Sequence, residues 1–578
     1  MEYLFHFAQQ QLARERSFIR RVLGGVVQDL AAKSSAISRA ARSFFQLSAP
    51  VSPDAARSVL ESIAVTPENA DSPENTPPST AGMTTKVVKG SLWTLLGQVA
   101  PLAVSLVATP FTIRLLGAEG YGVLILVGLI PTYLGFADFG MGLASTKFAS
   151  EAYAAGDAER EARTVRTAAV IALCASVPVA LLVILFSGRL VTLFNVPEHL
   201  FAEASLALKV AAVTFVLNFL NSIFNTPQLT RLRMDLNTFV TSGFRMLGII
   251  ATPIVIYLGF GILGAIVVLL AASLLTLAGH IYTSGRLLPK LFDLSLDRNA
   301  IRPLLKFGGA FAISTVAALL LGSSEKFILA HSTTMKELAY YSVAFTIATM
   351  LTMFSGAMTQ SLVPAFSQLQ GEGQHERLSD LYNRCIRLTS IAFFPTIVFV
   401  AIIGRPFLSI WAGEDFSQRS IGPLYILLAG LLLNAVAFFP AAMLMASGRT
   451  RTLAKLYWFE LVAYIPLAFL LVSSYGALGA AAAWSIRVIL DTFLLFLLAR
   501  SASSVSVDRP AAMAAIAVAI LAIPAGLVLY FGSLTGVLIA ISLTAFVAYA
   551  VMVWHFVLTT DELDWLRSRK YGRANFQY

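Results

Sequence analysis

Long apolar stretches recur along the 578-residue sequence and most constrain what it can fold into. Each is about 20 residues or longer, enough to cross a bilayer as a helix. Backbone polar groups in lipid must find hydrogen-bond partners within their own segment, so each stretch is expected to be α-helical. Charged residues make up only 13% of the chain, against about 25% in soluble proteins. The sequence therefore predicts an all-α polytopic membrane protein with fourteen spans, near residues 91–115, 121–143, 167–187, 204–226, 238–258, 262–283, 307–331, 339–364, 388–411, 420–446, 453–473, 476–499, 511–530 and 534–558.

The basic residues of the predicted loops fall mainly on one side of the membrane. One alternate set of loops, with the C-terminal tail, holds 23 Lys and Arg residues, and the other set holds 4. Cytoplasmic loops are enriched in Lys and Arg. We therefore expect a multi-pass protein of the cytoplasmic (inner) membrane with both termini in the cytoplasm. The net charge of +10 largely reflects this bias. Because the cations are dispersed over short loops, no nucleic-acid partner is expected.

Two pairs of similar segments indicate an internal duplication. GILGA at 261–265 matches GALGA at 476–480, and EGYGVLILVGLIPTYLGF at 119–136 corresponds to AYYSVAFTIATMLTMFSG at 339–356. The matches occur in the same order at nearly the same offset. Two six-helix repeats around a central cavity are a transporter plan, with the binding site between the repeats. The predicted units are an N-terminal extension (1–82), a first half (83–303), a second half (304–505) and two extra helices with a tail (506–578).

The N-terminal extension differs in composition from the rest. Residues 3–46 fit a basic, weakly amphipathic helix, and a Pro-, Ser- and Glu-rich linker predicted to be disordered follows. A dispensable extension is the favoured interpretation, because Met83 opens MTTKVVKGSLWTLL at the first span. A membrane-surface or partner-binding arm is the alternative.

The sequence gives no support for an enzyme. It lacks the G-x-x-x-x-G-K-[ST] phosphate loop and any His/Glu or Ser/His constellation within the spans. Cys174 and Cys385 have neither the spacing nor the surroundings of a disulfide or metal site. His280 is expected to be a packing residue. We therefore predict no catalytic residues, no metal and no cofactor.

Ionisable side chains within the spans are the candidates for a transport site, because burying a charge in lipid costs several kcal/mol. A cavity with cations suits a phosphate-bearing cargo. The cationic candidates for cargo binding are Arg114, Lys209, Lys326 and Arg487. The acidic candidates for coupling to a proton or sodium ion are Glu325, Asp138 and Asp491.

Structural roles remain open for several of these groups. Arg487 and Asp491 lie one helical turn apart, so they can also form a neutralised pair. Arg245 and Glu460 lie towards the cytoplasmic ends of their helices, where long side chains reach the interface.

Two motifs resemble the polysaccharide-transport branch of the multidrug/oligosaccharidyl-lipid/polysaccharide exporter superfamily. The first is R-x-L-G-x-x-x-Y-G after the first span, at Arg114–Gly122, followed by D-x-G at Asp138–Gly140. The second is an acidic-basic pair ending the seventh span, Glu325–Lys326, followed by Tyr340 and Tyr341. Glu stands where the family more often has Asp. The resemblance runs from about Lys86 to Arg500.

This resemblance implies a flippase for surface polysaccharide, such as O-antigen lipopolysaccharide or exopolysaccharide. Its cargo would be an oligosaccharide linked to a polyprenyl diphosphate, moved by a proton- or sodium-coupled mechanism. Arg114 and Lys326 would ring the outer mouth of the cavity. Glu325 would neutralise Lys326 when cargo is absent, or exchange an ion. Membrane lipids and the polymerase and export machinery are the implied partners.

Two related functions are the alternatives. Drug/cation antiporters of the superfamily commonly use a carboxylate in the first helix, where this chain has Arg114 and no acid. Lipid-linked peptidoglycan-precursor flippases typically carry a cation in the eighth helix, and residues 339–364 contain none. Both departures favour the polysaccharide branch.

The topology can be tested by cysteine-accessibility labelling in whole cells. Single cysteines placed within 332–337 and 413–415 should react with an impermeant reagent from outside, because those turns carry few cations. A cysteine within 370–375 should react only after the membrane is opened. Labelling of all three sites from one side would contradict the predicted arrangement.

Overall fold

A computed structural model describes residues 80–293, 295–352, 362–363, 365–503 and 536–557. This part of the chain is helical throughout. The helices are α3 (Thr80–Tyr133), η1 (Leu134–Asp138), α4 (Met141–Ala154), α5 (Ala158–Thr192), α6 (Glu198–Phe224), α7 (Thr226–Thr230), α8 (Met234–Val255), η2 (Ile256–Phe260), α9 (Gly261–Leu287), η3 (Pro289–Phe292), α10 (Arg298–Ser332), α11 (Met335–Met350), α13 (His375–Trp411), α14 (Glu414–Ala446), α15 (Thr450–Ser503), α17 (Gly536–Met552) and η4 (Val553–Val557).

The described residues contain seven helical stretches long and apolar enough to cross a membrane. Three of them are interrupted at a glycine with positive φ, at Gly117 (φ 68°), Gly259 (φ 90°) and Gly476 (φ 56°). Glycine adopts this backbone conformation without steric cost, so two predicted spans are joined with almost no loop. The all-helical membrane fold is confirmed. The span expected at 511–530 and residues 353–361 of the eighth span lie outside the described residues.

Two of these tight turns are capped by a glutamate from another helix. Glu203 Oε1 accepts a hydrogen bond from the Leu263 amide at 3.0 Å, beside Gly261. Glu337 Oε2 accepts one from the Ala477 amide at 2.9 Å, beside Gly476. Each carboxylate satisfies a free N–H at a helix start and complements the helix dipole there.

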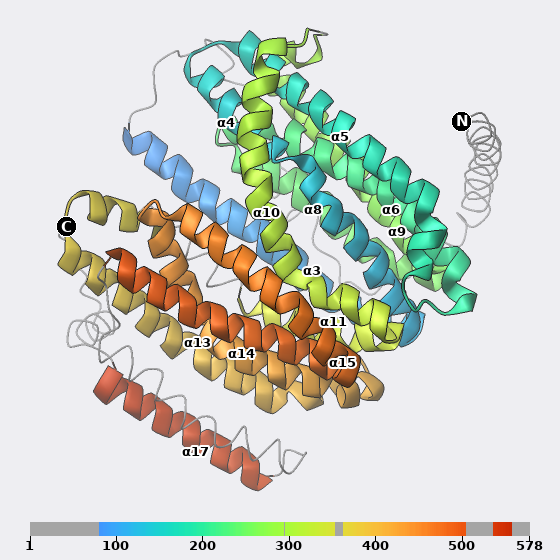
Figure 1. Cartoon of the computed structure of the whole chain (residues 1–578), viewed down its shortest axis with the longest axis vertical. Coiled ribbons are helices and arrows are strands. Elements are labelled where there is room, and N and C mark those ends of the chain that lie inside the picture. The colour runs from blue at the N-terminus through green and yellow to red at the C-terminus, as the bar shows by residue number, and fades with distance from the viewer. Residues whose placement is uncertain (1–79, 294, 353–361, 364, 504–535, 558–578) are drawn as a thin grey trace, which may run out of the picture. The chain divides into compact units, whose positions relative to one another are not determined.

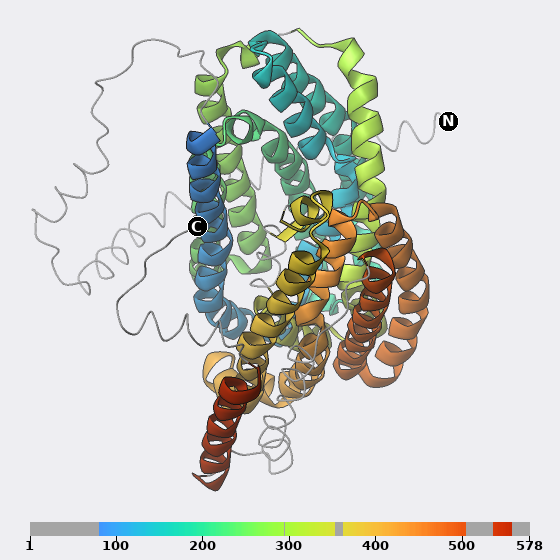
Figure 2. The ribbon, with the colours of Figure 1, turned by 90° about the vertical axis from the view of Figure 1, so that its left-hand side faces the viewer.

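The helices pack in two groups. In the first helix group, defined as α3 to α9, α3 packs on α8, and α6 lies between α5 and α9. In the second helix group, defined as α10 to α15, α14 packs against α11, α13 and α15. Both views show α13 to α15, in yellow to orange, apart from α5 to α9, in teal to green, while the yellow-green α10 runs beside the teal helices (Figures 1 and 2).

Helix α10 belongs to the second group but also contacts the first. Its first part lies against α4, where Gly308 meets Gly140 so closely that a Cβ on Gly140 would lie 2.8 Å from the Gly308 carbonyl oxygen. The backbone leaves helical geometry at Ser323. Leu321, before this break, and Ile328, after it, both pack in a cluster with Tyr464 of α15.

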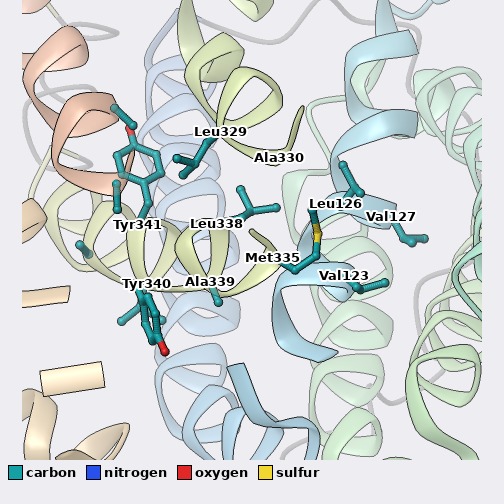
Figure 3. Close-up of a cluster of buried hydrophobic side chains, with 14 of the residues drawn as sticks. Val123, Leu126, Val127, Leu329, Ala330, Met335, Leu338, Ala339, Tyr340 and Tyr341 are labelled. Atoms are coloured by element: carbon teal, nitrogen blue, oxygen red, sulfur yellow. The ribbon is translucent and has the colours of Figure 1, made fainter. Parts of the chain in front are cut away.

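An apolar seal joins the two groups where α3, α10 and α11 meet (Figure 3). We define it as the buried residues of these three helices: Val123, Leu126, Val127, Leu329, Ala330, Met335, Leu338 and Ala339. Gly122 of α3 lies directly against the backbone carbonyl of Met335, and a Cβ there would be 2.7 Å from the Met335 carbonyl carbon. The absence of a side chain at Gly122 therefore lets the two helices touch through their backbones.

Substitution at Gly122 should disturb this seal. Gly122→Ala forces α3 and α11 apart, and overpacking of this kind costs about 1–3 kcal/mol. Gly128→Ala, in the same helix, is the matched control because a Cβ there meets nothing within 4 Å. Thermal unfolding of the purified proteins in detergent should show a lower melting temperature for Gly122→Ala alone. Equal melting temperatures would contradict the backbone contact.

Candidate functional site

Polar contacts reinforce the apolar seal at what we call the turn end, the end defined by the turns at residues 117, 193–197, 333–334 and 412–413. Arg114 Nη2 donates a hydrogen bond to the Ile410 carbonyl of α13 at 2.8 Å. Trp411 Nε1 donates one to the Leu106 carbonyl of α3 at 2.8 Å. Lys336 forms an ion pair with Glu119 at 3.1 Å. All three contacts join the first helix group to the second.

The turn before α6 is tied to the turn before α11. Asn195 Nδ2 donates to the carbonyls of His331 (2.9 Å) and Thr333 (2.7 Å), and the Asn195 amide donates to Ala330 at 3.1 Å. Asn195 thus satisfies backbone carbonyls at the end of α10. The turn end is closed by these bonds together with the seal.

Glu325 lies just past the break in α10 and is fully buried. The Tyr341 hydroxyl of α11 donates to its Oε1 at 3.0 Å, and the Tyr464 hydroxyl of α15 donates to its Oε2 at 2.7 Å. The neighbouring Lys326 places Nζ 4.1 Å from the centre of the Phe345 ring. Both carboxylate oxygens therefore have donors, and the carboxylate joins three helices of the second group.

A second buried charge cluster lies within α15. Glu460 is 6% exposed and Asp491 is 8% exposed. Arg487 Nη1 is 3.7 Å from Glu460 Oε2, and the guanidinium lies 5.4 Å from the Tyr464 ring centre. Neither oxygen of Glu460 has a hydrogen-bond partner among the described residues, nor does Oδ1 of Asp491. Arg487 therefore pairs with Glu460, which the sequence placed near the interface.

The remaining sequence candidates are dispersed. Asp138 lies at the N-terminal end of α4, where the amides of Met141 and Gly142 face its carboxylate. Asp138 itself ends η1, and the N-cap of α4 is Gly140. Lys209 is partly buried on α6 and has an interaction within the protein. Glu325 and Lys326 thus lie together on α10, Arg487 and Asp491 lie one turn apart on α15 with Glu460 as the ion-pair partner of Arg487, and Arg114 contributes to the turn end.

Two buried polar networks of the first helix group were not predicted from the sequence. Glu161 is fully buried and accepts two hydrogen bonds from Arg231, at 2.6 and 3.1 Å. His280 contacts Gln228 Nε2 at 3.0 Å and Thr241 Oγ1 at 3.1 Å, so it is hydrogen-bonded on both ring nitrogens. These hydrogen bonds agree with the packing role expected for His280. No local sequence pattern predicts the contact between Glu161 and Arg231, because the two residues are 70 positions apart.

Comparisons with known proteins give consistent results. A model of the family described as "Polysaccharide biosynthesis protein" matches residues 113–420. A Shigella flexneri protein named "Putative O-antigen transporter" is 24% identical over 416 residues, which cover 71% of this chain and 96% of that protein. A Bacillus subtilis protein, "Uncharacterized membrane protein EpsK", is 23% identical over 348 residues, covering 57% and 66%.

Two solved structures share the fold. A multidrug resistance MATE family transporter of the MOP superfamily, in an inward-facing conformation, gives a TM-score of 0.60 at 16% identity, covering 70% of this chain and 94% of that one. The lipid II flippase MurJ, in an inward closed conformation, gives 0.61 at 13% identity, covering 81% and 99%. The resemblance predicted from the motifs is confirmed.

Removing a tyrosine donor should destabilise the Glu325 site. Tyr464→Phe and Tyr341→Phe each leave one oxygen of a buried carboxylate without a partner, at a cost of about 1–3 kcal/mol. Tyr475→Phe is the control, because Tyr475 is 66% exposed. The two buried variants should melt at lower temperature in detergent, and the control should match the wild type. A wild-type melting temperature for both buried variants would show that the hydroxyls are not needed.

Proposed function

Because the chain belongs to the family of polysaccharide biosynthesis proteins, we propose that it flips a lipid-diphosphate-linked oligosaccharide across the cytoplasmic membrane. The chain is a multi-pass membrane transporter of the polysaccharide branch of the MOP superfamily, not an enzyme. The Shigella relative is named for O-antigen transport. The cargo proposed here is the corresponding lipid-linked unit of a surface polysaccharide.

The closed turn end is the observation that best supports transport by alternating access. A transporter that moves a polar headgroup must close one end of its path while the other receives cargo. Here the closure depends on contacts between the two helix groups, including those of Gly122, Arg114 and Trp411. Separation of α3 from α11 and α13 would open it. We take this end to be external, as the loop charges predict.

Arg114 is the cation best placed to meet a diphosphate at this end. Its side chain is exposed, and its hydrogen bond goes to a neutral carbonyl of Ile410. A phosphate oxygen accepts a stronger, charge-assisted hydrogen bond than a carbonyl does. Cargo can therefore replace Ile410 as the partner of Arg114 when the turn end opens. Lys326, held over an aromatic ring, and Lys209 are proposed to contribute further positive charge.

Ion coupling is proposed because buried acids accompany these cations. Glu325, Glu460 and Asp491 all lie in the second helix group. An acid that binds and releases a proton or sodium ion can bias the transporter between its two states only if the states differ in affinity for that ion. The fold is shared with a multidrug transporter and with a lipid II flippase, so the fold alone does not identify the cargo. The transport test therefore includes several substrates.

Loss of Arg114 should impair export without loss of folding. In vesicles, Arg114→Ala should slow translocation of a fluorescent lipid-diphosphate oligosaccharide about tenfold to hundredfold, the effect of losing about 1.5–3 kcal/mol of charge-assisted hydrogen bonding. Arg114→Lys should retain part of the rate, since lysine keeps the charge but loses the bidentate geometry. Arg233→Ala is the control, because that exposed arginine pairs with Asp235 two residues away.

The same vesicles should be offered a lipid-linked peptidoglycan precursor and a cationic dye. Preference for either of these over the oligosaccharide lipid would contradict the proposed cargo. Wild-type export by Arg114→Ala would contradict the proposed role of Arg114.

A further inference from the structure

We propose that Glu460 and Asp491 share one exchangeable proton beside Arg487, and that this pair is the proton-binding site of the second helix group. The site rests on the geometry of α15 alone. Its use in coupling rests on the proposed function above. The sequence predicts Glu325, Asp138 and Asp491 for this role and places Glu460 near the interface.

The charges of the cluster do not balance without a proton. Two carboxylates, each more than nine-tenths buried, accompany one guanidinium, that of Arg487. A buried charge that lacks a partner costs several kcal/mol. Binding one proton converts one carboxylate to a carboxylic acid and leaves a neutral cluster. The side chains of Glu460 and Asp491 lie within hydrogen-bonding reach of each other, so the new O–H has an acceptor in the other carboxylate and the two acids act as a pair.

Three of the four carboxyl oxygens of the pair have no donor in the described part of the chain. Both oxygens of Glu460 and Oδ1 of Asp491 have no hydrogen-bond partner among the described residues. Arg487 Nη1, at 3.7 Å from Glu460 Oε2, is beyond hydrogen-bond distance. A proton bound between the carboxyl groups would satisfy two of these atoms. The bound proton would therefore lie between the carboxyl groups of Glu460 and Asp491.

The other titratable groups near the pair come from two helices. Tyr457 and Tyr464 lie on α15 with the pair, and the Tyr464 hydroxyl donates a hydrogen bond to Glu325 of α10. Tyrosines are neutral near pH 7 and cannot balance the second carboxylate.

Glu325 differs from the pair in having its charge satisfied. Two hydroxyls donate to its carboxylate, and Lys326 follows it in the chain. Donors to the charged form favour that form. Both oxygens of Glu325 therefore have donors, whereas three oxygens of Glu460 and Asp491 have none among the described residues.

A contiguous set of contacts leads from the pair to the turn end. Arg487 lies over the ring of Tyr464, and Tyr464 donates to Glu325, beside the break at Ser323. The same helix continues to Leu329 and Ala330 of the seal. When the pair loses its proton, Arg487 is drawn more strongly to the carboxylates and away from Tyr464. The site is thereby placed to bias the segment of α10 that closes the turn end.

Infrared spectroscopy of the purified full-length protein tests the site directly. At neutral pH the wild type should show the C=O stretch of one protonated carboxyl group shielded from rapid hydrogen exchange. Glu460→Gln and Asp491→Asn should each lose this band, since each leaves a single carboxylate facing Arg487. Glu325→Gln and the surface control Glu151→Gln should keep it. Retention of the band in both Glu460→Gln and Asp491→Asn would overturn the proposal, as would a band that responds to sodium but not to pH.

Transport measurements then test coupling separately. Exchange of one proton per cargo across about one pH unit supports about a tenfold concentration ratio. Asp491→Asn should abolish that accumulation while retaining exchange of labelled for unlabelled cargo. Accumulation at the wild-type ratio would show that the pair does not couple transport. If neither the wild type nor any variant transports the oligosaccharide lipid, the proposed function is wrong. The infrared result still decides whether Glu460 and Asp491 hold a proton.

Discussion

The cost of placing a charge in a bilayer governs the position of the ionisable side chains in this protein. A lone charge in the hydrocarbon region costs several kcal/mol, so it must face protein, a partner or water. The structure shows different solutions at different sites. Glu325 accepts hydrogen bonds from two tyrosine hydroxyls, and Arg487 pairs with Glu460. Arg114 lies at the turn end and bonds a backbone carbonyl. Three of the buried charged residues, Glu325, Glu460 and Asp491, lie on α10 and α15.

Backbone contacts made possible by glycine complete this arrangement. Gly122 lets α3 touch α11 at the turn end, and Gly140 and Gly308 let α4 touch α10. Contacts of this kind are common between membrane helices, because small residues allow close packing where no hydrophobic driving force exists. Helix α10 takes part in both regions and is broken at Ser323. It is therefore the element through which changes at Glu325 can reach the seal.

The sequence predicted the helical membrane fold well, because the length of an apolar stretch is a local property. The tight turns at Gly117, Gly259 and Gly476 agree with the predicted ends of neighbouring spans. Partners of charges were harder to predict. Arg487 and Asp491 share a helix and were identified from their spacing, whereas Glu460 comes 27 residues before Arg487 on the other side of the Gly476 break. The tyrosines on Glu325 lie 16 and 139 residues from it, and only the fold shows that both reach it.

Translocation of a lipid-linked oligosaccharide is the central claim, and a deletion strain tests it most directly. Surface polysaccharide and the sidedness of the lipid-linked intermediate should be measured before and after the gene is restored. The account predicts loss of surface polysaccharide with accumulation of the intermediate on the cytoplasmic leaflet, both reversed by the full-length chain. An intermediate that still reaches the outer leaflet at the normal level in the deletion strain would contradict it.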